Sequence, residues 1–146
     1  MPTLAHRVHV ELSSIQGARG EMRGLGVDIT TAREGVLLIV GVEGRVDGSN
    51  AAEFQAAIEG AIQPSDRAAI VDMGEVQFMA SAGLLVFLVV GKLLQKQNAR
   101  LVGCSLSKPL REMFAISGFD KIMQLYDSRA DALRALKDLD WAAPGP

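Results

Sequence analysis

Hydrophobic residues recur along the chain with two spacings, one typical of strands and one typical of helices. Residues 26–32 and 36–44 are rich in β-branched residues, and Arg33, Glu34 and Gly35 lie between them, so the two segments predict a β-hairpin. In the chain that follows, short apolar runs alternate with segments of helical periodicity. These patterns predict strands over 68–73, 98–106 and 123–127, and helices over 49–63, from Ser81, over 107–118 and over 128–141.

This order of elements predicts an α/β protein, because alternating strands and helices form a sheet that is parallel in part, with helices packed on it. The expected fold is one domain over 24–140 with a mixed β-sheet of about four or five strands. Residues 1–23 are interpreted as an N-terminal extension or loosely held arm, in which 8–12 alternate well enough for a short strand. Residues 141–146 are interpreted as a tail.

The segment Phe78–Gly91 contains fourteen residues without a charge. A membrane-spanning helix needs roughly 20 apolar residues, so the length favours a buried element. Stepped at about 100° per residue from Ser81, the helix turns Val86, Phe87 and Val90 toward the sheet. Its opposite face is apolar for two turns and then polar, and it carries Ser81, Leu84, Leu85, Leu88, Lys92, Gln95 and Lys96. Either a neighbouring element covers these leucines or they form a partner-binding patch.

Ser81 gives this face a candidate chemistry. As the expected N-cap of the helix, it would place its hydroxyl beside free backbone N–H groups and the positive end of the helix dipole. In the simplest interpretation Ser81 is only a cap. A phosphate on the same hydroxyl would be favoured by the helix terminus and would add about −1.5 to −2 charges beside the apolar patch. Phosphorylation of Ser81 could therefore switch the binding of a partner at this face.

The composition is that of one ordinary soluble domain, and a cytoplasmic protein is expected. The chain has 146 residues, 49% of them hydrophobic, and a formal net charge of −2, which offers no footprint for nucleic acid. Cys104 is expected to be a buried thiol, so neither a disulfide within the chain nor a metal site is predicted. His6 and His9 are expected at the solvated surface. The charged chain start is unlike a signal peptide, and no cofactor or direct membrane insertion is indicated.

Catalysis is the main competing interpretation, because residues 79–83, MASAG, partly match the G-x-S-x-G elbow of serine hydrolases. Met79 stands where the first glycine belongs. Both histidines precede Ser81, so the hydrolase order of serine, acid and histidine cannot be assembled. The chain also has no G-x-x-x-x-G-K-[ST] phosphate loop. The sequence therefore favours a binding protein over an enzyme.

Four segments together resemble the STAS domain, and specifically the bacterial anti-sigma factor antagonists. They read VEGRVDGSNAAEF, IVDMGEVQFMASAGLLVFL, RLVGCSLSKPLREMF and ISGFDKIMQLYDSRADAL, and they follow the family's order over about 25–138. The resemblance implies a STAS-like α/β fold. It also implies that the serine after the motif aspartate, here Ser81, is phosphorylated by an anti-sigma factor that is a GHKL-type kinase. Ala80 replaces that aspartate, so the chain is either a weakly or differently phosphorylated switch or a constitutive binder.

The resemblance also implies a set of partners. The dephosphorylated protein would bind the anti-sigma factor and release a sigma factor, and a PP2C-type phosphatase would reverse the modification. The residues expected to contact the partner are Asp47, Asn50, Met79, Ser81, Leu84, Leu85 and Leu88. Two alternatives within the same family stay open, namely the STAS subunit of a bacterial phospholipid-transport ABC complex and a stressosome-type scaffold. The segments GFDKI and SRADAL favour the antagonist.

Overall fold

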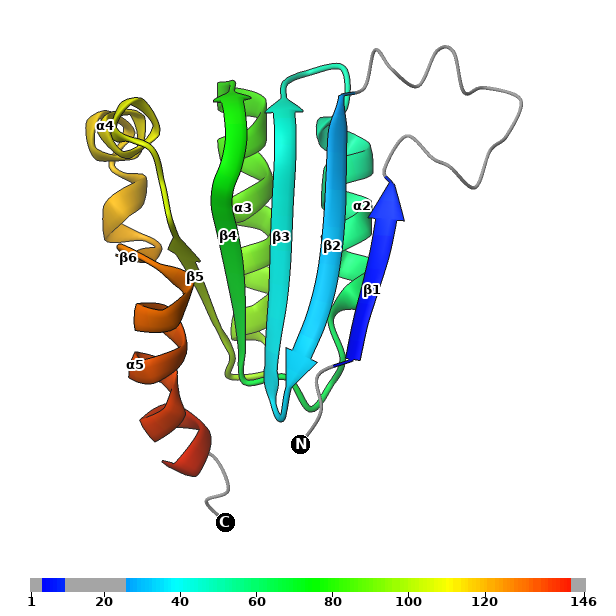
Figure 1. Cartoon of the computed structure of the whole chain (residues 1–146), viewed down its shortest axis with the longest axis vertical. Helices are drawn as coiled ribbons and strands as arrows, with labels where there is room; N and C mark the ends of the chain where they lie inside the picture. Colours follow the sequence, from blue (N-terminus) through cyan, green and yellow to red (C-terminus); the bar gives the residue numbers. More distant parts are fainter. Residues whose placement is uncertain (1–3, 10–25, 143–146) are drawn as a thin grey trace.

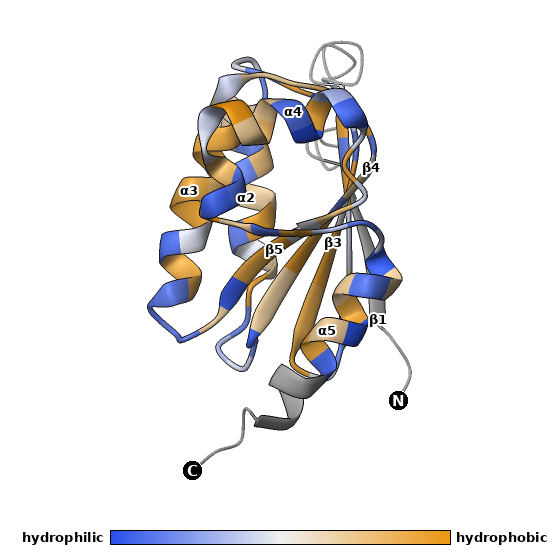
Figure 2. Cartoon of the chain, turned by 90° about the vertical axis from the view of Figure 1, so that its left-hand side faces the viewer, coloured by the Kyte–Doolittle hydropathy of each residue, from blue (hydrophilic) through white to orange (hydrophobic). Residues whose placement is uncertain are grey.

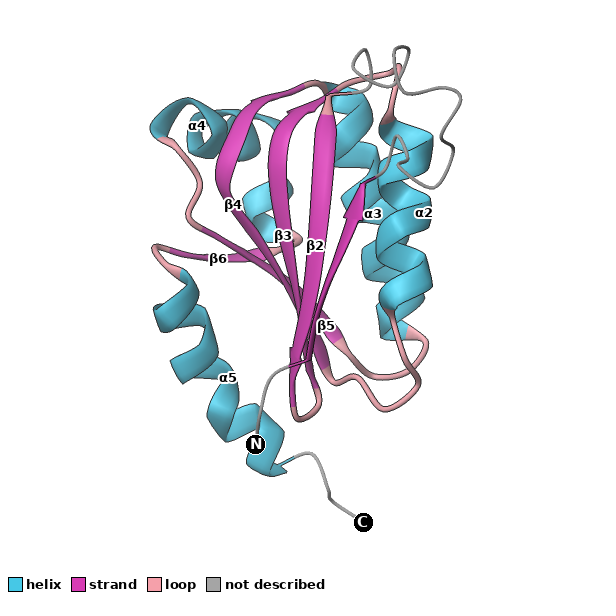
Figure 3. Ribbon diagram, turned by 45° about the vertical axis from the view of Figure 1, so that its right-hand side comes forward, coloured by secondary structure: helices cyan, strands magenta, loops and turns pink. Residues whose placement is uncertain are grey.

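The computed structural model describes residues 4–9 and 26–142. Its centre is a sheet of six strands that lie in the order of the sequence (Figures 1 and 3). The first three strands pair antiparallel, and the third to the sixth pair parallel. The strands are β1 (Leu4–His9), β2 (Val27–Glu34), β3 (Leu37–Val46), β4 (Ala68–Met79), β5 (Arg100–Cys104) and β6 (Gln124–Tyr126).

Helices cover both faces of this sheet. Helices α2 and α3 lie side by side on one face, and α5 lies on the other (Figures 1 and 3). Helix α4 follows β5 and leads through the short 3-10 helix η2 to β6. The helices are α2 (Ala51–Ala61), α3 (Ser81–Gln95), α4 (Lys108–Ser117) and α5 (Arg129–Ala142), with η2 at Phe119–Lys121. The parallel strands need such crossovers, because a short turn cannot connect them.

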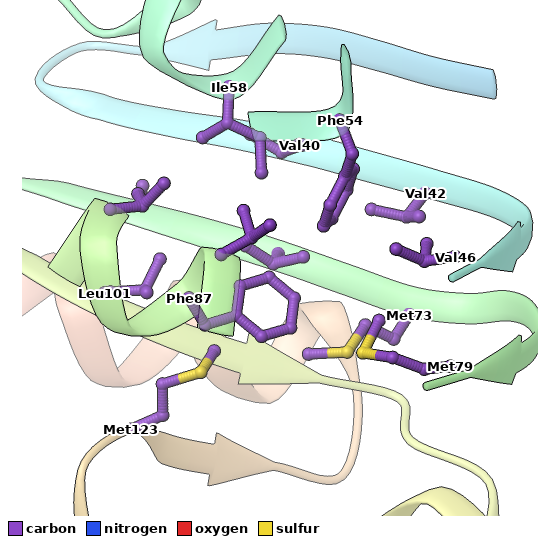
Figure 4. Packing of buried hydrophobic residues seen from close by; sticks show 14 of the residues in the cluster. Val40, Val42, Val46, Phe54, Ile58, Met73, Met79, Phe87, Leu101 and Met123 are labelled. Carbon is purple, nitrogen blue, oxygen red and sulfur yellow. The ribbon is translucent and has the colours of Figure 1, made fainter. Parts of the chain in front are cut away.

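The alternation of side chains along each strand divides the core into two clusters. In β3, Val40 and Val42 point to the layer of α2 and α3, whereas Leu37 and Ile39 point to α5. The residues buried between the sheet and its helices are mostly hydrophobic (Figures 2 and 4). This double coverage explains why the central strands read as nearly continuous apolar runs.

Three aromatic rings of the larger cluster pack against one another and connect its helices. Phe54 of α2 meets Phe87 of α3 edge-on, with ring centroids 5.8 Å apart, and Phe87 meets Phe114 of α4 at 6.1 Å. All three side chains are fully buried. Such aromatic pairs add about 0.5–1.5 kcal/mol beyond the burial of their area. The position of α3 is thus fixed from both sides.

The predicted fold class and hairpin are confirmed, with three differences in extent. The sheet has six strands because Leu4–His9, within the predicted extension, pairs antiparallel with β2. The strand predicted at 68–73 continues to Met79, since β4 pairs with β3 along its whole length. The helix predicted from Ser49 has Asn50 at its N-cap. Residues 10–12 of the predicted 8–12 strand, and 143–146 of the tail, lie outside the described residues.

The predicted boundaries of α4 are also confirmed. Ser107 is its N-cap, and its Oγ accepts a hydrogen bond of 3.3 Å from the Leu110 N–H. Gly118 ends the helix with φ +81°, a left-handed conformation that glycine adopts without the strain of a Cβ atom.

Candidate functional site

The candidate site lies where β3 and β4 end, at the edge of the sheet from which α2 and α3 begin. Val46 and Met79 are paired in the register of the two strands. The Ala80 N–H donates a hydrogen bond of 2.8 Å to the Val46 carbonyl, which joins the end of β3 to the start of α3. Because both strands are parallel, their carboxyl ends bring the loop after β3 and the first turn of α3 to the same edge.

Gly83 allows the first turn of α3 to lie close to these strand ends. A Cβ atom on Gly83 would lie 2.8 Å from Cγ of Met79 and 3.0 Å from Cγ1 of Val46. These distances are shorter than ordinary contacts between carbon atoms, so a side chain at position 83 would force Met79 or Val46 to move. The Gly83 N–H also bonds to the Ala80 carbonyl at 2.9 Å. The backbone around Ser81 is therefore fixed from both sides.

Ser81 is exposed at the helix N-terminus, as expected, but it is not the N-cap. Ala80 has the extended φ and ψ of an N-cap, −90° and 172°, and Ser81 is the first residue of the helix. The boundary lies one residue earlier than expected because the Ala80 N–H still bonds to the strand. The Ser81 hydroxyl forms no hydrogen bond with any residue that the structure describes, so it is available to a partner. Near it lie the unpaired N–H groups that begin any helix.

The loop after β3 is organised around Asp47. Its carboxylate accepts hydrogen bonds from the Ser49 hydroxyl at 2.6 Å and from the Ser49 N–H at 2.9 Å. These two bonds hold the pKa of Asp47 below its ordinary value of 3.8, and the charge of Arg45 adds a smaller effect. Asp47 is partly exposed, so its carboxylate stays charged and accessible beside the first turn of α2.

Asn50 does not contact solvent, which corrects the expectation that it would touch a partner. It is fully buried, and its amide oxygen accepts from the Asp47 N–H at 2.9 Å while its amide nitrogen donates to the Arg45 carbonyl at 2.8 Å. A buried amide needs such partners, because leaving it unpaired would be costly. Asn50 therefore holds the loop in shape.

Exposed apolar side chains continue from Ser81 along α3. Leu85 is 57% exposed, Val89 is 42% exposed and Leu88 is half-buried. Together with Ser81 they form a surface that we call the α3 strip. Sequence reasoning missed Val89, although its position, four residues after Leu85, places it on the same side of the helix.

Two residues expected on this surface lie in the core instead. Leu84 is 4% exposed and Met79 is 3% exposed. Leu84 precedes the buried Phe87 by three positions, and both belong to the hydrophobic cluster of the helix layer. Met79 points to the helix layer and lies near Met73 (Figure 4), because the alternation of β4 turns its neighbour Phe78 outward instead.

The described residues offer no metal site. They contain no group of three or more histidine, cysteine or acidic residues that could hold a metal ion. Cys104 is buried, as expected, and burial raises the pKa of its thiol. His6 and His9 belong to β1, of which the structure describes only the backbone. No helix in the described ranges is long and apolar enough to cross a membrane.

Comparison with known proteins gives a consistent match. A family model described as the STAS domain matches residues 29–132. A protein named as an anti-sigma factor antagonist, BtrV of Bordetella bronchiseptica, is 36% identical over 101 residues, which cover 69% of this chain and 87% of that relative.

Solved structures show the same fold. An anti-sigma factor antagonist from Mycobacterium paratuberculosis aligns with a TM-score of 0.71 at 24% identity, over 77% of this chain and 96% of that one. SpoIIAA in its unphosphorylated form aligns with a TM-score of 0.65 at 18% identity, over 75% of this chain and 96% of that one. The Bacillus SpoIIAA in the phosphorylated form aligns with a TM-score of 0.55 at 18% identity, over 74% and 98%.

Proposed function

Because the chain belongs to the STAS domain family, we propose that it is an anti-sigma factor antagonist, which binds an anti-sigma factor through the α3 strip and is switched by phosphorylation of Ser81. The observation that carries the proposal is the exposed Ser81 hydroxyl at the start of a helix whose exposed face is apolar. The named relative supports the general function. The proposed partner is an anti-sigma factor of GHKL kinase type, and a PP2C-type phosphatase would remove the phosphate. Binding to the anti-sigma factor and phosphorylation both take place in the cytoplasm.

The α3 strip has the character of a binding surface. An exposed apolar face on a helix that already buries its other side gains nothing for the fold, and such patches commonly mark interaction sites. Leu85 and Val89 are its exposed centre, and Asp47 lies at the same edge of the sheet as Ser81. The contact set is thus Asp47, Ser81, Leu85, Leu88 and Val89, because Asn50, Met79 and Leu84 are buried.

Phosphorylation at Ser81 would act on this surface in two ways. The phosphate would be stabilised in the free protein by the N-terminus of α3. It would also place about −1.5 to −2 charges one helical turn from Leu85, and a partner covering the strip would have to desolvate that charge. The modified protein is therefore the released form. SpoIIAA, which has the same fold, has been solved in a phosphorylated form.

The replacement of the family's aspartate by Ala80 leaves the acceptor in place. Ser81 is held by backbone bonds, from Ala80 to Val46 and from Gly83 to Ala80, and none of them uses the side chain of residue 80. An aspartate at that position would therefore serve recognition by the kinase or orientation of the hydroxyl. We infer that Ser81 still accepts phosphate, at a reduced rate.

The test is to incubate the chain with its GHKL-type anti-sigma factor and ATP and to follow the intact mass. The wild type should slowly gain one phosphate, Ser81→Ala should gain none, and Ala80→Asp should react faster. Ser65→Ala is the matched control, because its exposed hydroxyl lies between α2 and β4, outside the proposed contact set, and it should react like the wild type. If the wild type binds the anti-sigma factor but gains no phosphate, and only the Ala80→Asp variant gains one, the wild type is a constitutive binder.

A further inference from the structure

A groove lies beside the α3 strip, on the side of α3 that is turned away from α2. It is lined by the second half of α3, by α4, and by the segment from β5 through η2 to β6. Its volume is about 1090 Å³. Leu88 and Ile122 contribute apolar surface to it, and Ile122 is 56% exposed. Pockets for small molecules usually measure about 300–1,000 Å³, so this groove has the size for a segment of polypeptide.

The groove is basic although the chain as a whole is acidic. Of the residues that the structure describes, four basic ones line it, Lys92, Arg100, Arg111 and Lys121, with one acidic residue, Asp120, whereas the chain has a formal net charge of −2. Arg111 is paired with Asp127. Among the residues that the structure describes, Lys92, Arg100 and Lys121 form no ion pair. Such local concentration of one charge attracts a partner of the opposite charge.

We propose that this groove binds an acidic amphipathic helix of the anti-sigma factor, an inference that rests on the function proposed above. The apolar residues of such a helix would contact Leu88 and Ile122, and its carboxylates would face the surrounding cations. A helix of this kind matches both properties of the groove, whereas a purely acidic or a purely apolar segment matches only one. The geometry thus assigns the partner an acidic docking element.

The groove is continuous with the α3 strip. Ser81, Leu85, Leu88 and Lys92 follow one another at spacings of three or four residues on the same side of α3, and the last two also line the groove. From Ser81 to Lys92 the helix axis measures about 16 Å, at 1.5 Å per residue. A partner of ordinary interface size, about 800 Å² on each side, can cover both regions at once.

Single-stranded nucleic acid is a poorer match for this groove. Proteins that bind it use exposed aromatic rings on which the bases stack. Among the described residues that line the groove, Phe87 is the only aromatic one, and its side chain is 1% exposed. A phosphate backbone would also match the cations of the groove but not the apolar side chains of Leu88 and Ile122.

The test compares two double variants that change the net charge equally. Arg100→Glu/Lys121→Glu reverses charge in the groove away from α3, and Lys108→Glu/Lys137→Glu reverses exposed charges on α4 and α5 outside the groove. Titration calorimetry with the anti-sigma factor should show binding at least about tenfold weaker for the groove variant at low salt. The control variant should stay within about twofold, and the difference should shrink at high salt.

A crosslink identifies what occupies the groove. Ile122→Cys carrying a benzophenone maleimide gives a single reactive position, because Cys104 is buried. In the complex it should capture a segment of the anti-sigma factor rich in Asp and Glu, with apolar residues every three or four positions. Capture of a basic or neutral segment, or no capture while the complex forms, would overturn the inference.

The remaining outcomes separate the inference from the function on which it rests. If the wild type binds and both double variants bind equally well, the groove is not used, and the α3 strip alone is the interface. If a single-stranded oligonucleotide binds the groove and displaces the partner, the groove binds nucleic acid instead. If the groove variant changes the mass of the free chain in solution, the groove binds a second copy of the chain. Either result would overturn the inference. If no GHKL-type anti-sigma factor binds the wild type, the proposed function itself fails.

Discussion

Two neighbouring leucines of α3 give a sharp test of the site, because the structure separates them by burial. Leu84 is 4% exposed and Leu85 is 57% exposed. Replacing Leu84 with alanine removes core atoms and leaves a cavity, so we expect the free energy of unfolding to fall by about 2–5 kcal/mol. Replacing Leu85 with alanine changes only the surface, and the free energy should stay within about 0.5 kcal/mol. Urea denaturation measures both values.

The same pair should behave in the opposite way in binding. Full burial of a leucine side chain stabilises by about 1.5–3 kcal/mol. Because 57% of Leu85 remains accessible in the free chain, covering it in a complex is worth roughly 0.9–1.7 kcal/mol. Leu85→Ala should therefore weaken the anti-sigma factor complex by about 1–1.5 kcal/mol, roughly 5- to 12-fold in Kd. Titration calorimetry measures this loss, with Leu84→Ala as the control at a temperature where it is folded.

Two results would refute this reasoning. A loss of unfolding free energy above about 2 kcal/mol in Leu85→Ala would show that this residue belongs to the core. An unchanged Kd in a stable Leu85→Ala variant would show that the partner binds elsewhere, and the α3 strip would then need another explanation.

Three further outcomes follow from the same site. Gly83→Ala should lower the free energy of unfolding by about 1–3 kcal/mol in urea denaturation, because the new Cβ meets Met79; a neutral effect would show that the strand ends can move. Ser81→Asp should weaken partner binding by at least about tenfold without lowering the melting temperature, and unchanged binding would leave Ser81 with no switching role. In an NMR titration the pKa of Asp47 should lie below 3.8 and rise in Ser49→Ala. Since the pKa of Asp47 is lower in the folded state, its stabilisation is present above the unfolded value and lost as the pH falls through the folded value.

Most of the regular elements were predictable because they are supported by the local sequence. The pattern around Ser107 and Gly118 contained the cap and the stop of α4, and the structure shows both. The exposure of Ser81 followed from its expected position at the start of the helix, on the side opposite the face that packs on the sheet. In these places the local sequence and the tertiary structure require the same conformation.

The details of the site depend on contacts that periodicity does not contain. Stepping a helix by 100° gives the direction of Leu84, but whether that direction is covered depends on tertiary packing. Phe114, which packs against Phe87 in the same cluster, lies about 27 residues later in the chain. Likewise, the burial of Asn50 follows from hydrogen bonds within a loop whose shape the sequence did not predict. The strand Leu4–His9 depends on pairing with Asp28–Arg33, which lies beyond an intervening segment of the chain.

The structure also explains how a switch can be placed on this fold without weakening it. The Ser81 hydroxyl has no hydrogen-bond partner among the described residues, so a phosphate there breaks no bond of the folded chain. The backbone bonds of Ala80 and Gly83, which hold Ser81 in place, do not involve that hydroxyl. Phosphorylation should therefore not lower the free energy of unfolding, while the added charge acts on whatever covers Leu85. Stability and affinity can then be altered separately, because α3 turns one side to the core and the other to the partner.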